Sequence, residues 1–191
     1  GVEKQDGMFT VRTADGDTFE AGLVVHGAGR IPALESLGLD AAGVDCSQQI
    51  SVDDHLRCED NHAIYLAGDA APHSLPLTPV AEAEAAAVVE TISGNPTSVD
   101  YSGIPIVLFG SPVLAGAGLS EEEATEERRE VEITFKDTST GATNRRYNLD
   151  RSGYKIIIQQ PEGRIIGAHI LGIHAEEIIN IFALAIRERI P

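Results

Sequence analysis

The sequence predicts an α/β region followed by an α+β region with an antiparallel sheet. In the first region, an apolar run over 64–67 ends in a glycine and a carboxylate, and an alanine-rich helical stretch follows at 81–90. In the second, apolar and polar residues alternate over 131–135, as in a half-exposed strand, and a buried strand and a hairpin follow over 154–171. The segment 93–98 is rich in Gly, Pro and Ser, so we place a domain boundary near residue 100.

The carboxylate after the apolar run is Asp69, preceded by Gly68. We expect Thr78 to cap the following helix, Pro79 to take its first position, and the helix to stop near Gly94. A carboxylate accepts hydrogen bonds from sugar-type hydroxyls, and a helix N-terminus offers free N–H groups and about half a positive charge. The pair suits a polyol attached to an electron-rich ring, and it is equally compatible with an ordinary β-α turn.

Composition narrows the functional classes. The net charge is −16, with 3 Lys against 11 Arg, which disfavours binding to nucleic acids and anionic membranes. The sequence contains neither a run of transmembrane length nor a signal peptide, so the cytoplasm is the expected location. A strongly acidic, lysine-poor surface is typical of proteins from high-salt habitats, where self-repulsion is screened, and we expect a halophilic source.

The two cysteines, Cys46 and Cys58, are twelve residues apart and match neither C-x-x-C nor C-x₄-C, so we expect two free thiols. The histidines also lack the companions that a metal site needs: His55 and His62 are expected in solvated loops. His174 and Glu177 are spaced i, i+3, which predicts capping or intrahelical pairing. We therefore predict no metal site.

The first region opens with strand patterns over 1–17 and a buried strand at Leu23–Val25. The segment 26–32 has too few glycines for a G-x-G-x-x-G phosphate loop, and no helical pattern follows it at once. Gly29 and Pro32 predict a tight turn on their own.

In the second region, Ser120 and Glu123 form a capping box, which predicts a short helix with a solvated acidic first turn. Strands, a hairpin turn and a final helix then follow, giving an antiparallel sheet of about three to five strands. The predicted elements are a strand at 131–135, a weaker strand at 145–149, a buried strand at 154–159, a turn at 161–163, a strand at 164–171 and a helix at 174–190 with apolar Ile178, Ile181, Phe182, Ala185 and Ile186. The apolar face of that helix fits either a core or a dimer interface.

The order of these features resembles the pyridine nucleotide-disulfide oxidoreductases, which include glutathione reductase, dihydrolipoamide dehydrogenase and mercuric reductase. The segment 27–32 is similar to the (A/G)-x-G-R-x-P motif of that family, and 64–69 to its second FAD-contact motif. The segment 101–112 resembles the entry to its dimerisation domain. The spacing from Gly153 to Ile179 matches a long C-terminal signature of the same family.

The resemblance implies FAD and NAD(P) as cofactors. It implies that Asp69 and the adjacent Gly68 hold the flavin ribityl chain, that Thr78 lies near the flavin ring, and that Gly29 lies against the nicotinamide nucleotide. It further implies that residues 101–191 pair two subunits into a homodimer. The parent activity would pass electrons from NAD(P)H through FAD to a disulfide or similar acceptor.

Several parts of the family pattern have no match here: the G-x-G-x-x-G loop for FAD, the redox C-x₄-C and the H-P-x-x-E motif. We therefore expect a C-terminal fragment, with 1–100 ending an NAD(P) domain and completing an FAD domain, and 101–191 forming an incomplete dimerisation domain. Such a chain holds no catalytic residue and is inactive alone. The alternatives are a non-catalytic dimerisation module, or a single-cysteine relative such as a coenzyme A disulfide reductase or NADH oxidase.

Overall fold

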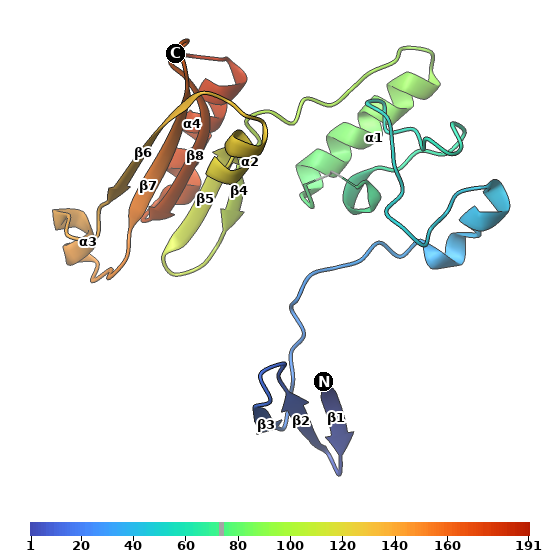
Figure 1. Ribbon diagram of the computed structural model, residues 1–191, viewed down its shortest axis with the longest axis horizontal. Helices are drawn as coiled ribbons and strands as arrows, with labels where there is room; N and C mark the ends of the chain where they lie inside the picture. Colours follow the sequence, from blue (N-terminus) through green and yellow to red (C-terminus); the bar gives the residue numbers. More distant parts are fainter. Residues whose placement is uncertain (73–74) are drawn as a thin grey trace. The chain divides into compact units, whose positions relative to one another are not determined.

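The computed structural model describes residues 1–72 and 75–191, which form two compact units, Gly1–Val99 and Asp100–Pro191 (Figure 1). Among the described residues, no helix is both long and apolar enough to cross a membrane.

The first unit begins with a three-stranded antiparallel sheet. Its strands are β1 (Val2–Gln5), β2 (Met8–Arg12) and β3 (Thr18–Ala21), in that order. Asp6 and Gly7 both have positive φ, at 48° and 85°, which is the backbone that a tight hairpin between β1 and β2 requires. The expected strands of the first 17 residues are therefore present.

The buried strand predicted at Leu23–Val25 is wrong. These residues have no regular structure, and the side chains of Leu23 and Val25 are 76% and 82% exposed. An apolar strand is buried only when neighbouring strands or helices cover it. The described residues supply no strand beside 23–25.

Two short 3-10 helices, η1 (Glu35–Leu37) and η2 (Leu39–Ala42), lead into the core of the first unit. This core consists of loops that hold small and branched side chains: Val44, Ile50, Val52, Leu56, Cys58, Leu66 and Ala71. The run 64–67 is extended but forms only an isolated bridge, Arg57 to Tyr65, rather than the expected strand. Its backbone is satisfied locally instead, because Cys58 donates to Ile64 at 2.8 Å.

The chain then forms the 3-10 helix η3 (Gly68–Ala70) and the helix α1 (Thr78–Ile92). The expected helix is confirmed, and Gly94 with φ 96° follows its end. The predicted cap is wrong by one residue, since Leu77 has the extended N-cap conformation and Thr78 is the first helical residue. Leu77 takes this place because its carbonyl accepts from both Val80 and Ala81 at 3.0 Å.

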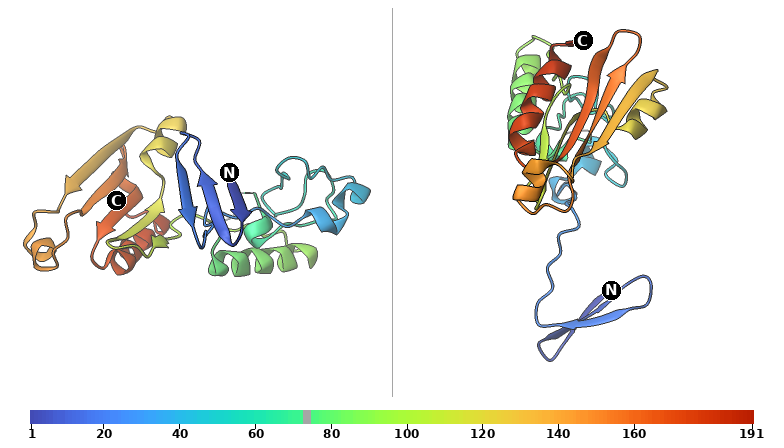
Figure 2. Two further views of the ribbon diagram at one scale, coloured as in Figure 1. Left: turned by 90° about the horizontal axis from the view of Figure 1, so that it is seen from below. Right: turned by 90° about the vertical axis from the view of Figure 1, so that its left-hand side faces the viewer.

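The second unit is a five-stranded antiparallel sheet with the order β4-β5-β8-β7-β6. Its elements are β4 (Ile106–Leu108), β5 (Val113–Gly118), α2 (Glu121–Glu126), β6 (Val131–Asp137), α3 (Ala142–Arg146), β7 (Gly153–Gln159), β8 (Arg164–Gly172) and α4 (Ala175–Arg187). Figures 1 and 2 show α4 along one face of the sheet. The predicted capping box is present: Ser120 accepts from the Glu123 N–H at 3.1 Å, and Glu123 accepts from the Ser120 N–H at 2.7 Å.

The weak strand predicted at 145–149 is wrong, because α3 occupies part of this segment. Asn144 donates to the Thr138 carbonyl and to the Ser152 hydroxyl, both at 2.6 Å. These hydrogen bonds stabilise a helical turn between β6 and β7. In the described residues, no strand pairs with 145–149.

The helix α4 buries one stripe against β5 and β8, formed by Ala175, Ile179 and Ala183, with Phe182 and Ile186 packed beside it. The sheet presents alanines to this stripe, so helix and strands approach closely. Ile178 and Ile181 instead lie 40% and 70% exposed. The predicted apolar positions therefore divide between the core and the surface.

Candidate functional site

The best-defined polar arrangement in the first unit lies where η3 meets α1. Gly68 has φ +66°, and a Cβ added there would lie 3.2 Å from the Cβ of Ala81. Only glycine adopts this backbone without strain while packing so close to the helix. The Gly68 N–H donates to Glu84 Oε2 at 2.6 Å, and Glu84 is completely buried. The helix thus fixes the backbone from which Asp69 projects.

The carboxylate of Asp69 stays open to further donors. Among the described residues, its one side-chain partner is Arg30, whose Nη1 lies 3.2 Å from Oδ2. The two side chains are 88% (Arg30) and 48% (Asp69) exposed, so this ion pair is weak. The carboxylate can exchange this ion pair for hydrogen bonds from a polyol.

The start of α1 provides a positive end. Pro79 has no N–H, and the N–H groups of Val80 and Ala81 donate to the Leu77 carbonyl. The first turn carries no acidic side chain, although acids are the usual neutralising residues there. The helix therefore keeps the positive end that an electron-rich ring would face.

Gly29 lies in the exposed segment 22–33, with φ +95° and no atom within 4 Å of an added Cβ. Its neighbour Arg30 joins this segment to Asp69 through the ion pair above. The structure thus brings Gly29 toward Gly68 and Asp69 in the first unit. Thr78 lies at the start of α1, the helix on which Gly68 packs through Ala81.

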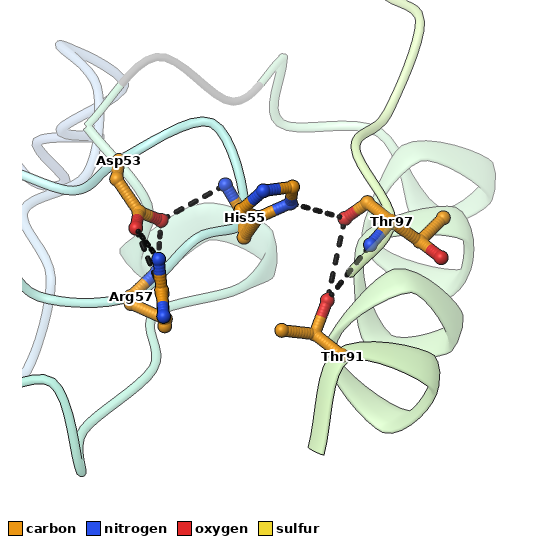
Figure 3. Close-up of polar contacts among 5 residues, drawn as sticks. All are labelled: Asp53, His55, Arg57, Thr91 and Thr97. Atoms are coloured by element: carbon orange, nitrogen blue, oxygen red, sulfur yellow. Dashed lines mark hydrogen bonds and ion pairs between the residues drawn. The ribbon is translucent and has the colours of Figure 1, made fainter. Parts of the chain in front are cut away.

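A second polar cluster, shown in Figure 3, connects the loop 53–57 with the end of α1. Asp53 accepts from the N–H groups of His55 and Arg57 at 2.9 and 3.0 Å, and from Arg57 Nε at 2.8 Å. His55 Nδ1 lies 3.1 Å from the Thr97 carbonyl, and the Thr97 N–H donates to the Thr91 hydroxyl. His55 is therefore half-buried and connects its loop to the segment after α1 through Thr97. The expectation of a solvated loop histidine is wrong.

The acidity of Asp53 follows from these contacts. Partial burial raises the pKa of Asp53, but the side-chain hydrogen bond from Arg57 and the two backbone N–H bonds outweigh it. The resulting pKa lies below the ordinary value for an aspartate. These contacts favour the charged form of the Asp53 carboxylate. They stabilise the loop 53–57 and occupy the carboxylate with partners from the same loop.

The remaining titratable candidates have local partners. His62 is exposed, as expected, and His169 Nε2 lies 3.1 Å from the Leu119 carbonyl. His174 lies 4.0 Å from Glu176 rather than pairing with Glu177. In residues 1–72 and 75–191, no group of three His, Cys, Asp or Glu side chains is placed to hold a metal ion.

Cys46 and Cys58 are free thiols, as predicted. Partial burial raises the pKa of Cys46, and the nearby carboxylates Asp40 and Asp45 raise it further. The thiolate that a redox cysteine needs is therefore disfavoured at Cys46.

Sequence reasoning missed Glu84 and Arg30. Glu84 is the glutamate that aligns with the buried stripe of α1, one helical turn after Val80 and one turn before Ala87 and Val88. A carboxylate in that position is a recognisable signal for a buried acceptor. Nothing in the local pattern links Arg30 to Asp69, because they are 39 residues apart.

Comparisons with known proteins identify the family of this chain. A model of the pyridine nucleotide-disulphide oxidoreductases matches residues 1–85, and the model of the dimerisation domain of that family matches residues 104–191. The chain is also 39% identical over 140 residues to an uncharacterized 19.7 kDa protein in the mercuric resistance operon of Staphylococcus aureus, covering 72% of this chain and 78% of that protein. The chain belongs to the pyridine nucleotide-disulphide oxidoreductase family.

Longer members of the family are similar over almost the whole chain. Glutathione reductase from Burkholderia cepacia is 33% identical over 98% of this chain and 42% of its own length. Dihydrolipoyl dehydrogenase from Bacillus subtilis is 33% identical over 97% of this chain and 40% of its own length. The chain thus spans about two fifths of these relatives.

Solved structures show the same fold. LpdA from Mycobacterium tuberculosis superposes with a TM-score of 0.78 at 23% identity, covering 99% of this chain and 41% of that chain. The flavoprotein disulfide reductase RclA from Escherichia coli superposes with a TM-score of 0.76, also at 23% identity, covering 100% of this chain and 43% of that chain.

Proposed function

We propose that this chain contributes cofactor-binding and dimerisation surfaces to an FAD-dependent NAD(P)H oxidoreductase. The chemistry that FAD supplies in such a protein is two-electron transfer from NAD(P)H to a disulfide or a similar acceptor. Residues 1–100 would form the end of an NAD(P) domain and the second half of an FAD domain. Residues 101–191 would join two subunits into a homodimer.

The single observation that carries the proposal is the rigid support of Asp69. Gly68 has a backbone conformation, with φ +66°, that few other residues tolerate, and its N–H donates a hydrogen bond to the buried Glu84 on α1. The side chain of the next residue, Asp69, is 48% exposed, so its carboxylate is accessible to a hydroxylated chain.

We assign each of the four residues a role that its place in the first unit supports. Asp69 and Gly68 would hold the ribityl chain, and the start of α1 at Thr78 would face the negative part of the flavin ring. Gly29 would let a nicotinamide nucleotide approach the backbone closely, because it has no Cβ and its φ of +95° is strained for other residues. None of these residues transfers a proton or an electron itself.

We further propose a cytoplasmic protein from a high-salt habitat, on the basis of the net charge of −16. At that charge, self-repulsion destabilises the compact state, and salt screens it. The stability of the chain should therefore rise between low and molar sodium chloride. Thermal melts across that range would overturn this part of the proposal if stability fell or stayed constant.

Flavin titration of the 191-residue chain tests the cofactor role. Asp69→Ala should weaken binding at least tenfold, because the variant loses charge-assisted hydrogen bonds to hydroxyls. Glu82→Ala removes an exposed carboxylate from α1 and is the matched control, expected to bind as the unmodified chain does. Quenching of FAD fluorescence measures the dissociation constants.

Two results would contradict the cofactor role. One is the absence of saturable binding by the chain, and the other is equal binding by Asp69→Ala and Glu82→Ala. If the chain then still formed dimers in sedimentation, a non-catalytic dimerisation module would be the better description.

A further inference from the structure

The strand β6 forms one outer edge of the second unit's sheet (Figure 1), and no strand of the described residues pairs with its free side. Gln160 donates to Glu130 and Thr138 donates to Ser152, both at 2.9 Å. Backbone hydrogen bonding alternates along an antiparallel strand, so the N–H and C=O groups of the even-numbered residues of β6 point toward β7. The N–H and C=O groups of Val131, Ile133, Phe135 and Asp137 therefore point away from the sheet.

The sequence of this edge is complementary to itself. When a second β6 runs antiparallel and Thr134 lies opposite its own copy, Glu132 lies opposite Lys136 and Ile133 lies opposite Phe135. Opposite charges and paired apolar side chains are the cross-strand combinations that stabilise a sheet. Twofold symmetry produces each of these pairs twice.

The side chains on the edge are free to make these pairs. Ile133 and Phe135 are 37% and 68% exposed and share the sheet face opposite α4. In the described part of the chain, Lys136 makes no ion pair, and Glu132 contacts only the amide of Gln160 at 3.2 Å. An added copy would cover both apolar side chains on one face and neutralise both charges on the other.

We propose that β6 pairs with β6 of a second copy of this chain, centred on Thr134, so that two sheets join into one. The inference rests on the homodimer proposed above and names the surface that forms it. The register uses the full length of β6. A register centred on Ile133 would leave Asp137 without a strand residue opposite it and would set Lys136 against Glu130, outside β6.

Pairing of this kind stops at two copies. An edge strand with open N–H and C=O groups is a template for uncontrolled addition, and natural proteins cover such edges or place charges on them. Isologous pairing uses the β6 edge of both copies at once. The opposite edge, β4, has only three residues and does not extend the sheet further.

A single cysteine at the centre of the register tests the proposal. Thr134 is exposed and would lie opposite its own copy at a non-hydrogen-bonded position, where Cα atoms are about 4.5 Å apart. Thr134→Cys should therefore form an intermolecular disulfide under mild oxidation by oxidised glutathione, measured on a non-reducing gel. The unmodified chain controls for Cys46 and Cys58.

Lys136→Cys is the matched control on the same strand and face. Its own copy would lie four residues away along the strand, too far for a disulfide, although Glu132→Cys combined with Lys136→Cys should crosslink. Crosslinking of Thr134→Cys no greater than that of Lys136→Cys overturns the proposed pairing. Preferential crosslinking of Ile133→Cys overturns the register.

Charge reversal provides a second measurement. Glu132→Lys or Lys136→Glu places like charges opposite each other twice, so each should raise the dimer dissociation constant about tenfold, and the double variant should restore it. Analytical ultracentrifugation separates the two levels of the proposal. A dimer whose dissociation constant is unchanged by either single reversal contradicts β6 pairing but leaves the homodimer. An unmodified chain that stays monomeric contradicts both the β6 pairing and the homodimer.

Discussion

The backbone N–H of Gly68 donates a 2.6 Å hydrogen bond to the carboxylate of Glu84, which is completely buried. This contact connects η3 to the middle of α1. Gly68 directly precedes Asp69 in the chain, so we expect the position of the proposed ligand residue to depend on the buried Glu84.

Glu84→Ala should destabilise the first unit by about 1–3 kcal/mol, because a buried N–H loses its acceptor. The reactivity of Cys58, which is completely buried, reports opening of this unit in a Cys46→Ser background. We expect faster labelling of Cys58 in Glu84→Ala. Glu84→Gln keeps an acceptor oxygen and should have the smaller effect, so equal labelling rates in the two variants would contradict this role.

Asp53 should make the first unit sensitive to acid. Its pKa is lowered in the fold, so its contribution is present above the unfolded value of about 3.9 and is lost as pH falls through the folded value. Asp53→Asn should cost about 1 kcal/mol at pH 7 and progressively less as the pH falls through the folded pKa of Asp53. Urea unfolding followed by circular dichroism, measured from pH 7 to pH 2, would show the two stability curves approaching each other. A constant difference would exclude this linkage.

Gly118 and Gly163 offer a matched pair of substitutions. Their φ values are +72° and +71°, but a Cβ at Gly118 would lie 2.2 Å from the Ile166 carbonyl, whereas at Gly163 it meets nothing within 4 Å. Gly163→Ala should cost about 1–2 kcal/mol from backbone strain alone. Gly118→Ala adds overpacking and should cost about 3 kcal/mol or more. Thermal melts of the second unit would refute this account if the two variants melted together.

The capping box should hold α2 in place. Ser120→Ala should cost about 1 kcal/mol and speed hydrogen exchange at the Glu123 amide, which loses its acceptor. The backbone N–H of Ser120 lowers the pKa of Glu123, so the reciprocal bond is present at neutral pH and is lost in acid. Glu123→Gln should therefore remove the acid dependence of this exchange. Unchanged exchange in Ser120→Ala would argue against the cap.

Local patterns predicted the second unit well because its elements are stabilised by near neighbours. The turn at 161–163 joins β7 and β8, and the capping box of α2 needs only residues 120–123. The segment 145–149 was mistaken for a strand because its side chains carry no sign of the Asn144 contacts to Thr138 and Ser152. That network depends on residues six and eight positions away.

The first unit was harder to predict, because its apolar runs resemble strands whose partners the described chain does not contain. Leu23–Val25 and 64–67 have the composition of buried strands, yet the former is exposed and the latter makes a single bridge. The candidate residues Gly68, Asp69, Thr78 and Gly29 could be named from motifs. Their supports, Glu84 and Arg30, depend on long-range contacts that a motif does not encode.

The exposed segment 22–33 also decides how the chain can be divided. It has no regular structure, and the Arg30 side chain is 88% exposed. A trypsin-like protease recognises a basic residue in an open stretch of this kind, so the bond after Arg30 is a site for early cleavage. One cut there would separate a peptide that contains β1–β3 and ends at Arg30. The remaining chain would then lose the covalently attached cation that pairs with Asp69.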